Sequence, residues 1–140
     1  MNPDVLRAFL ERRDPALLGT VATLREDGFP HVVPVWYRWD GEAVFIWSDE
    51  KRQWARNLRR DPHVAFSVQD GKAPYPAVAM RGLAALRHGR DEEILAEIRR
   101  ICERYVPAEK LDGFLEEWTA GPQILVRIEP VVIRSWSAAV

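Results

Sequence analysis

The sequence contains a single cysteine, only three lysines and no long hydrophobic run. The lone Cys102 excludes a disulfide scaffold and is typical of a protein in a reducing cytoplasm. No stretch reaches the ~18 consecutive apolar residues of a membrane-spanning helix, and residues 1–15 are charged throughout, unlike a signal peptide. We therefore expect a soluble, cytoplasmic protein that does not bind membranes.

An excess of either charge is also absent, because 20 basic residues face 21 acidic ones for a net charge of −1. This balance argues against bulk attraction to nucleic acid or to anionic lipid. Arginine supplies nearly all of the positive charge, which fits either a GC-rich genome or a need for forked anion-binding groups. Apolar residues, by contrast, make up 47% of the 140 residues, which excludes disorder and suits one globular domain spanning residues 1–140.

Alternating apolar residues and tight turns predict a mainly β chain. Asp27-Gly28 and Asp40-Gly41 are hairpin signals that join the first three strands into an antiparallel meander. The expected strands are 17–24, 29–39, 42–48, 63–68, 77–87 and 123–136. Gly82 suggests a bulge or barrel corner in its strand, and Pro130 breaks or bulges the last one. The expected helices are 3–13, 51–60, 91–106 and one marked by Leu111, Phe114, Leu115 and Trp118. This order predicts a six-stranded antiparallel split β-barrel of Greek-key type with peripheral helices.

The sequence lacks the residue patterns of several kinds of catalytic site. His31, His63 and His88 lie on three different predicted elements, without the short spacing of a metal site. Cys102 lies on the apolar side of helix 91–106, where a free cysteine behaves as a small hydrophobe. No serine has the flanking pattern of a hydrolase nucleophile, and no two glycines have the spacing of a Rossmann site. We expect no metal and assign no catalytic residue.

The start of helix 51–60 has the features of an anion-binding site. A helix N-terminus presents unpaired backbone N–H groups and the positive end of its dipole. Arg52 and Arg56 are four residues apart and share a face, and arginine binds phosphate through two parallel hydrogen bonds. The acidic residues nearby oppose an anion, and a solvated basic face is the alternative interpretation. The neighbouring polar residues are Ser48, Asp49, Glu50 and Lys51.

Pro34 lies in the middle of the strong strand pattern 29–39. Because proline removes a ladder donor, this strand belongs at a sheet edge or a bulge. The backbone from Val33 to Trp36 is then free to meet the polar edge of a planar ring, although a simple edge strand is the alternative. Together with the helix start, this strand outlines a ligand that has both a ring and a phosphate.

Three segments resemble the pyridoxamine 5′-phosphate oxidase-like flavin-binding split barrels, a family that includes FMN enzymes and oxidoreductases using the deazaflavin coenzyme F-420. The segments are LLGTVATLREDGFPHVVPVWYRWDGEAVFIWSDE, RNLRRDPHVAFSV and AVAMRGLAALR, and the resemblance extends over residues 5–135. It implies a homodimer with two cofactor sites at the interface, each built from both chains. The implied cofactor-binding residues are His31, Val33, Pro34, Val35 and Trp36 along the ring, Ser48, Lys51, Arg52, Arg56 and Asn57 around the phosphate, and Tyr75 and Trp136 closing the site, the last two from either chain.

The sequence departs from the family pattern at one position. Many members have a lysine three residues before the asparagine that corresponds to Asn57, and this chain has Trp54 there. If that lysine holds the phosphate in other members, then Lys51, Arg52 or Arg56 must replace it, or the affinity for the cofactor is reduced.

The resemblance implies an oxidoreductase that transfers hydride between bound FMN or coenzyme F-420 and a small organic substrate. The cofactor supplies the hydride chemistry in such enzymes, so a cluster of catalytic side chains is not required. Tyr37, Tyr75 and His31 are candidate proton donors, and each also suits a structural role. A non-enzymatic flavin- or haem-binding or storage protein on the same barrel is the alternative. A small barrel for single-stranded nucleic acid is a third interpretation, which the balanced charge opposes.

Overall fold

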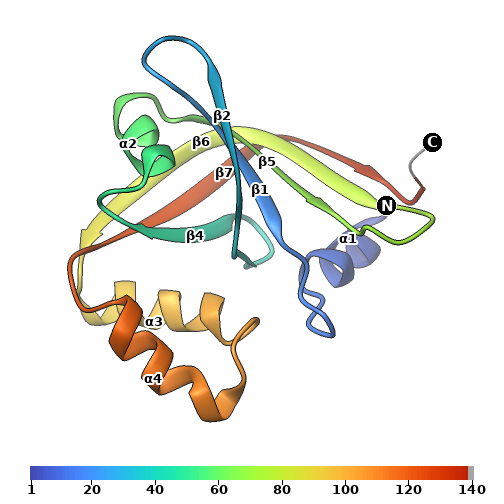
Figure 1. Ribbon diagram of the computed structural model, residues 1–140. Helices are drawn as coiled ribbons and strands as arrows, with labels where there is room; N and C mark the ends of the chain where they lie inside the picture. Colours follow the sequence, from blue (N-terminus) through green and yellow to red (C-terminus); the bar gives the residue numbers. More distant parts are fainter. Residues whose placement is uncertain (139–140) are drawn as a thin grey trace.

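The computed structural model describes residues 1–138, which form one curled antiparallel sheet with four helices around it (Figure 1). The sheet order is β2-β1-β5-β6-β7-β4-β3. The strands are β1 (Gly19–Leu24), β2 (Pro30–Val35), β3 (Arg38–Trp39), β4 (Val44–Asp49), β5 (His63–Gln69), β6 (Ala77–Gly89) and β7 (Gln123–Trp136). The helices are α1 (Pro3–Leu10), α2 (Gln53–Arg60), α3 (Glu92–Cys102) and α4 (Ala108–Trp118). The mainly β, antiparallel split-barrel class is confirmed.

The predicted strand 29–39 is in fact two strands, β2 and β3, so the predicted count of six strands is wrong. Trp36 and Tyr37 separate them and leave the ladder. The Tyr37 N–H donates to the Tyr105 hydroxyl at 3.3 Å, and the Tyr37 carbonyl accepts from the Arg104 guanidinium. These side chains satisfy the backbone groups that a continuous strand would have paired.

This break determines the shape of the sheet. Since β2 and β3 are the two terminal strands, a two-residue connection brings opposite edges of the sheet near each other. The sheet therefore curls into a barrel that stays open between these edges. Both predicted hairpins are present, with Gly28 and Gly41 in the left-handed region at φ 88° and 100°. The three strands of the expected meander nevertheless do not lie side by side, because β4 pairs with β7 instead of β2.

The predicted irregularity at Gly82 and Pro130 is a β-bulge between the two long strands. Arg81 is opposite Val132 and Gly82 is opposite Pro130, so Val131 is the extra residue in β7. A Cβ at position 82 would overlap the Glu129 carbonyl oxygen, which explains the glycine. The bulge lets both strands continue while they bend around the barrel.

The helices form where the sequence predicts them, but three are shorter. The α1 helix ends at Leu10, α2 begins at Gln53, and α3 ends at Cys102. Arg104 and Tyr105, two and three residues after the end of α3, bind the junction between β2 and β3. Cys102 is fully buried, as predicted, and burial raises the pKa of its thiol to about 12.

The helices differ in how they meet the barrel. The α2 helix buries Trp54, Ala55 and Leu58 in the barrel core. The α3 and α4 helices lie together beside β4 at one end of the barrel (Figure 1). Among residues 1–138 no helix is both long and apolar enough to cross a membrane. The same part of the chain has no group of three or more His, Cys, Asp or Glu side chains arranged to hold a metal ion.

Candidate functional site

A cavity of about 290 Å³ opens between β2, the end of β4, the start of α2 and helix α4. We call it the β2–α4 cavity. Small-molecule sites in proteins occupy ~300 Å³ or more, so the cavity of a single chain has room for a ring system but little beyond it. Its lining residues are Val33, Pro34, Val35, Trp36, Trp47, Ser48, Asp49, Arg52, Trp54, Phe114 and Trp118.

One end of the β2–α4 cavity is polar. Arg52 occupies the N-cap position of α2, and within residues 1–138 no side chain caps this helix. The first N–H groups of α2 and the Arg52 guanidinium therefore provide positive charge and donors at the same place. The Ser48 hydroxyl donates to the Asp49 carbonyl at 2.6 Å, and an Asp49 carboxylate oxygen accepts from the Lys51 N–H at 2.8 Å. This end suits an anionic group, with Asp49 as the opposing charge.

The other end of the cavity is aromatic. Trp36 lies at its centre, stacked on Tyr105 with ring centroids 5.0 Å apart and planes 8° apart. Phe114 is 5.4 Å from Trp36 on one side, and Trp47 is 6.2 Å away on another. Trp118 stacks on Phe114 at 5.9 Å and is 53% exposed at the cavity mouth. Flat apolar walls of this kind suit a planar conjugated ring.

The strand β2 supplies a backbone edge to the same cavity. It is a terminal strand that pairs with β1 along one side, with Pro34 opposite Thr20 and Val33 opposite Val21. Pro34 therefore lies on a sheet edge, as the sequence predicts. The outer edge of β2 has backbone groups that the ladder does not use, and they are available to the polar edge of a ring.

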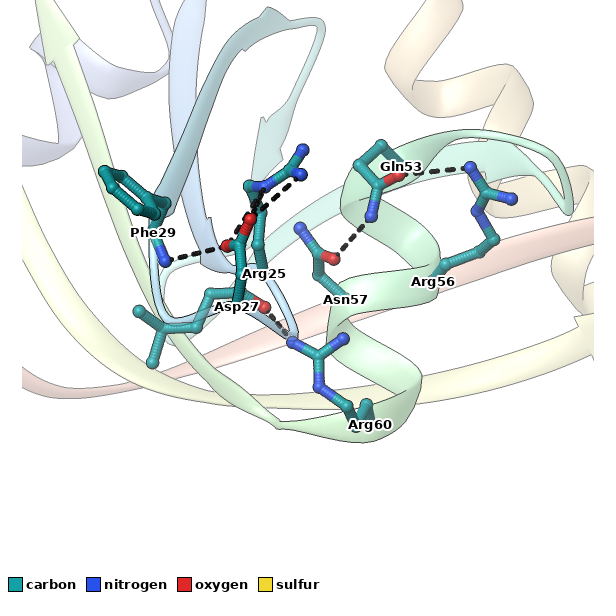
Figure 2. A network of polar contacts seen from close by, with 8 residues as sticks. Arg25, Asp27, Phe29, Gln53, Arg56, Asn57 and Arg60 are labelled. Atoms are coloured by element: carbon teal, nitrogen blue, oxygen red, sulfur yellow. Dashed lines mark hydrogen bonds and ion pairs between the residues drawn. The ribbon is translucent and has the colours of Figure 1, made fainter.

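Six of the twelve implied cofactor residues lie in the lining of this cavity: Val33, Pro34, Val35, Trp36, Ser48 and Arg52. The remaining six do not line it within one chain. Asn57 is fully buried, where its amide donates to Thr23 Oγ1 at 3.0 Å and accepts from Gln53 at 2.7 Å. Arg56 is exposed and donates to Gln53 Oε1 at 3.1 Å (Figure 2). Lys51 is exposed on the turn before α2, and His31 pairs with Thr23 further along β2.

Tyr75 and Trp136 lie together at another edge of the barrel. Trp136 is opposite Ala77 in the ladder of β6 and β7, and Tyr75 is two residues before Ala77. Both aromatic side chains are about half exposed. Tyr75 adopts φ 60°, a left-handed conformation that is unusual for a bulky residue and often marks a functional position.

Trp54 stands where the resemblance implies a lysine. Its side chain is only 3% exposed, packs in the barrel core and forms part of the cavity wall. Arg52 is therefore the one basic side chain in the lining, among the described residues.

The candidate proton donor Tyr37 is structural. Its buried hydroxyl donates to the Leu10 carbonyl at 2.6 Å, and burial raises its pKa to about 12. It does not line the cavity.

Sequence reasoning missed three aromatic side chains of the lining, Trp47, Phe114 and Trp118. Phe114 and Trp118 are four residues apart, so the sequence places them on one helix face. That pattern does not distinguish a face that packs in a core from one that covers a cavity.

The fold is a split barrel, and its cavity combines aromatic walls with a cationic helix start. A sequence model described as pyridoxamine 5′-phosphate oxidase matches residues 3–137, and the chain belongs to that family. The residues present fit the flavin-type groups of the family, with aromatic walls for the ring and with Arg52 and the start of α2 for an anionic end.

Solved structures give a consistent result. The conserved hypothetical protein Rv2991 from Mycobacterium tuberculosis is 29% identical with a TM-score of 0.77, over 97% of this chain and 84% of that one. An F-420 reductase is 31% identical with a TM-score of 0.68, over 91% of this chain and 94% of that one. HutZ, the haem storage protein from Vibrio cholerae, shares the fold at 19% identity with a TM-score of 0.70, over 95% and 92%. No curated protein matches the chain.

Proposed function

We propose that this protein is an oxidoreductase that uses FMN or coenzyme F-420 to transfer hydride to or from a small organic substrate. The observation that supports this proposal is the β2–α4 cavity, which combines aromatic walls, a free strand edge and a cationic helix start. Membership of the family and similarity to an F-420 reductase support the same cofactor class.

The residues of the chain have distinct parts in this proposal. When bound, the flavin or deazaflavin supplies the hydride chemistry. Arg52 and the first N–H groups of α2 bind its anionic group, while the outer edge of β2 orients the ring. Trp36, Phe114 and Trp118 exclude water from the ring face.

A homodimer with the cofactor at the interface belongs to the same proposal. Val32, Val131 and Leu83 are 62%, 70% and 45% exposed on the outer face of the barrel. A shallow, mainly apolar hollow of about 500 Å³ runs over this face, lined from β1, β2, β5, β6 and β7. Exposed apolar surface of this extent is typical of a protein interface. A second chain would also bring Tyr75 and Trp136 within reach of a cavity that one chain leaves small.

A matched pair of arginine variants tests the cofactor site. We expect Arg52→Ala to weaken cofactor binding about tenfold, as loss of one charge-assisted contact predicts. Arg59→Ala is the control on the same helix, because Arg59 lies near His88 Nδ1 at 3.1 Å and away from the cavity. Equal affinity in both variants, measured by fluorescence titration, would remove Arg52 from the site.

The second candidate function is a binder that holds flavin or haem without turnover. Within residues 1–138, Asp49 is the one carboxylate in the lining, and its position beside the cationic helix start does not suit proton transfer to a ring substrate. Haem is the less favoured ligand, because the described lining contains no His, Cys, Met or Tyr side chain to serve as an axial ligand. Steady-state assays with quinone, nitro and biliverdin-type acceptors separate the two functions, since a binder gives no turnover with any of them.

A further inference from the structure

A second cavity, separate from the β2–α4 cavity, is lined mainly by arginine. It has a volume of about 200 Å³ and lies between the end of α1, strand β3 and the C-terminal half of α3. We call it the arginine cavity, and it shares no lining residue with the first. Its lining residues are Glu11, Arg13, Arg38, Trp39, Arg100, Glu103 and Arg104.

One buried carboxylate serves two of these arginines. Glu97 Oε1 lies 3.1 Å from Arg38 Nε, and Glu97 Oε2 accepts a hydrogen bond from Arg100 at 3.0 Å. The Arg38 contact is an ion pair without hydrogen-bond geometry. Within residues 1–138 the Arg38 guanidinium makes no hydrogen bond, although its side chain is three-quarters buried. Its N–H groups are therefore free to donate to an added acceptor, whereas the buried side-chain atom that lacks a hydrogen bond within residues 1–138 is the acceptor Glu97 Oε1.

The carboxylates that line the arginine cavity do not supply that acceptor. Glu11 is held by Arg7 at 2.7 Å on the surface of α1. Glu103 is 3.7 Å from Arg13, a loose contact between two exposed side chains.

Arg104 adds a buried positive charge. It is 8% exposed and donates to the carbonyls of Leu10 at 3.1 Å and Arg12 at 3.0 Å, as well as to Tyr37. No carboxylate of residues 1–138 lies within ion-pair distance of it. Carbonyl oxygens stabilise a guanidinium but leave its net charge in place.

The charged residues that line the arginine cavity, counted together with their ion-pair partners Arg7 and Glu97, comprise five guanidinium groups and three carboxylates, which leaves an excess of two positive charges. The guanidinium groups are those of Arg7, Arg13, Arg38, Arg100 and Arg104, and the carboxylates are those of Glu11, Glu97 and Glu103. We propose that the arginine cavity binds a phosphate-type oxyanion, either free phosphate or the phosphate of a phosphorylated metabolite. A dianion balances the excess, and planar guanidinium forks match its oxygens. With ~30 Å³ for each water, the cavity has room for a tetrahedral oxyanion and part of its hydration shell.

Calorimetric titration of the full chain with sodium phosphate, against sodium chloride at equal ionic strength, tests this proposal. We expect saturable binding of phosphate and none of chloride. Arg100→Gln should weaken phosphate binding at least tenfold, and Arg13→Gln, at an exposed position, should weaken it severalfold. Arg99→Gln is the matched control, because Arg99 is the neighbour of Arg100 on α3 and pairs with Asp112 at 2.8 Å. Phosphate binding should be unchanged in that control.

Further arms identify the site and the source of the phosphate. Arg52→Gln should leave in place the phosphate binding that Arg100→Gln removes, because Arg52 lines the other cavity. Tighter binding of adenosine monophosphate than of inorganic phosphate, lost in Arg100→Gln, would support a phosphorylated metabolite, and equal binding would support free phosphate. Absence of saturable binding, equal losses in Arg99→Gln and Arg100→Gln, or loss in Arg52→Gln alone would each overturn the proposal.

Discussion

The ring of Tyr105 supports Trp36 from behind, with centroids 5.0 Å apart and planes 8° apart. The Tyr105 hydroxyl donates to the Leu17 carbonyl at 2.7 Å and accepts from the Tyr37 N–H at 3.3 Å. One side chain therefore both fixes the break between β2 and β3 and supports a wall of the β2–α4 cavity.

Substitution of Tyr105 should separate these two roles. Tyr105→Phe keeps the stacked ring but leaves the Leu17 carbonyl and the Tyr37 N–H without partners, so we expect a loss of about 1–3 kcal/mol in unfolding free energy. Cofactor affinity should stay close to that of the wild type. Tyr105→Ala should lower both stability and affinity, as measured by urea unfolding and fluorescence titration. A Phe variant as weak in binding as the Ala variant would contradict this division.

Trp118 offers a test of the aromatic wall that is independent of stability. Because its side chain is 53% exposed, Trp118→Ala should change the unfolding free energy by less than about 1 kcal/mol. It should weaken ring binding by about 1 kcal/mol, or roughly fivefold, through loss of a stacking surface. Glu117→Ala, at the neighbouring exposed position of α4, is the control and should bind normally.

Two glycine substitutions should have opposite effects. Gly82→Ala forces a methyl group against the Glu129 carbonyl in the bulge and should destabilise the protein by about 3 kcal/mol or more. Gly113→Ala, on α4 with open space around it, should stabilise the protein by up to ~1 kcal/mol. Thermal unfolding of both variants checks the pair, and a neutral Gly82→Ala would show that the bulge can relax.

The buried thiol of Cys102 should make the stability of the protein depend on pH in the alkaline range. Burial raises the pKa of its thiol from 9.0 to about 12, so the unfolded chain releases this proton first. Stability should therefore be unaffected by this group below about pH 9 and should fall as the pH rises from there towards 12. Cys102→Ala should make that decline less steep, although Tyr37, with a pKa raised to about 12, contributes in the same direction. An unchanged slope in urea unfolding measured across this range would contradict the assignment.

Local sequence signals predicted much of the fold. The Asp-Gly pairs determine both hairpins, because glycine adopts the left-handed conformation that each turn requires. Pro34 indicates a sheet edge, since it has no N–H for a second ladder. Gly82 marks the bulge for a comparable steric reason.

The features that the sequence did not predict depend on distant contacts. The break at Trp36 and Tyr37 is held by Arg104 and Tyr105, which are 67 and 68 residues away from Tyr37. The alternation of apolar and polar residues along a strand does not indicate which distant side chains will bind its backbone. The position of Phe114 in the cavity wall could not be predicted either, because its helical spacing fits a buried core as well as a cavity wall.

Equilibrium titration of the wild-type protein with FMN and with coenzyme F-420 determines whether the β2–α4 cavity binds a flavin-type cofactor. Tryptophan fluorescence is the readout, because Trp36, Trp47 and Trp118 line the β2–α4 cavity. We expect saturable quenching by at least one cofactor, and weaker binding of that cofactor in Arg52→Ala and in Trp118→Ala. Binding of neither cofactor would contradict this expectation, and would indicate that Trp54 in place of lysine has removed the phosphate site.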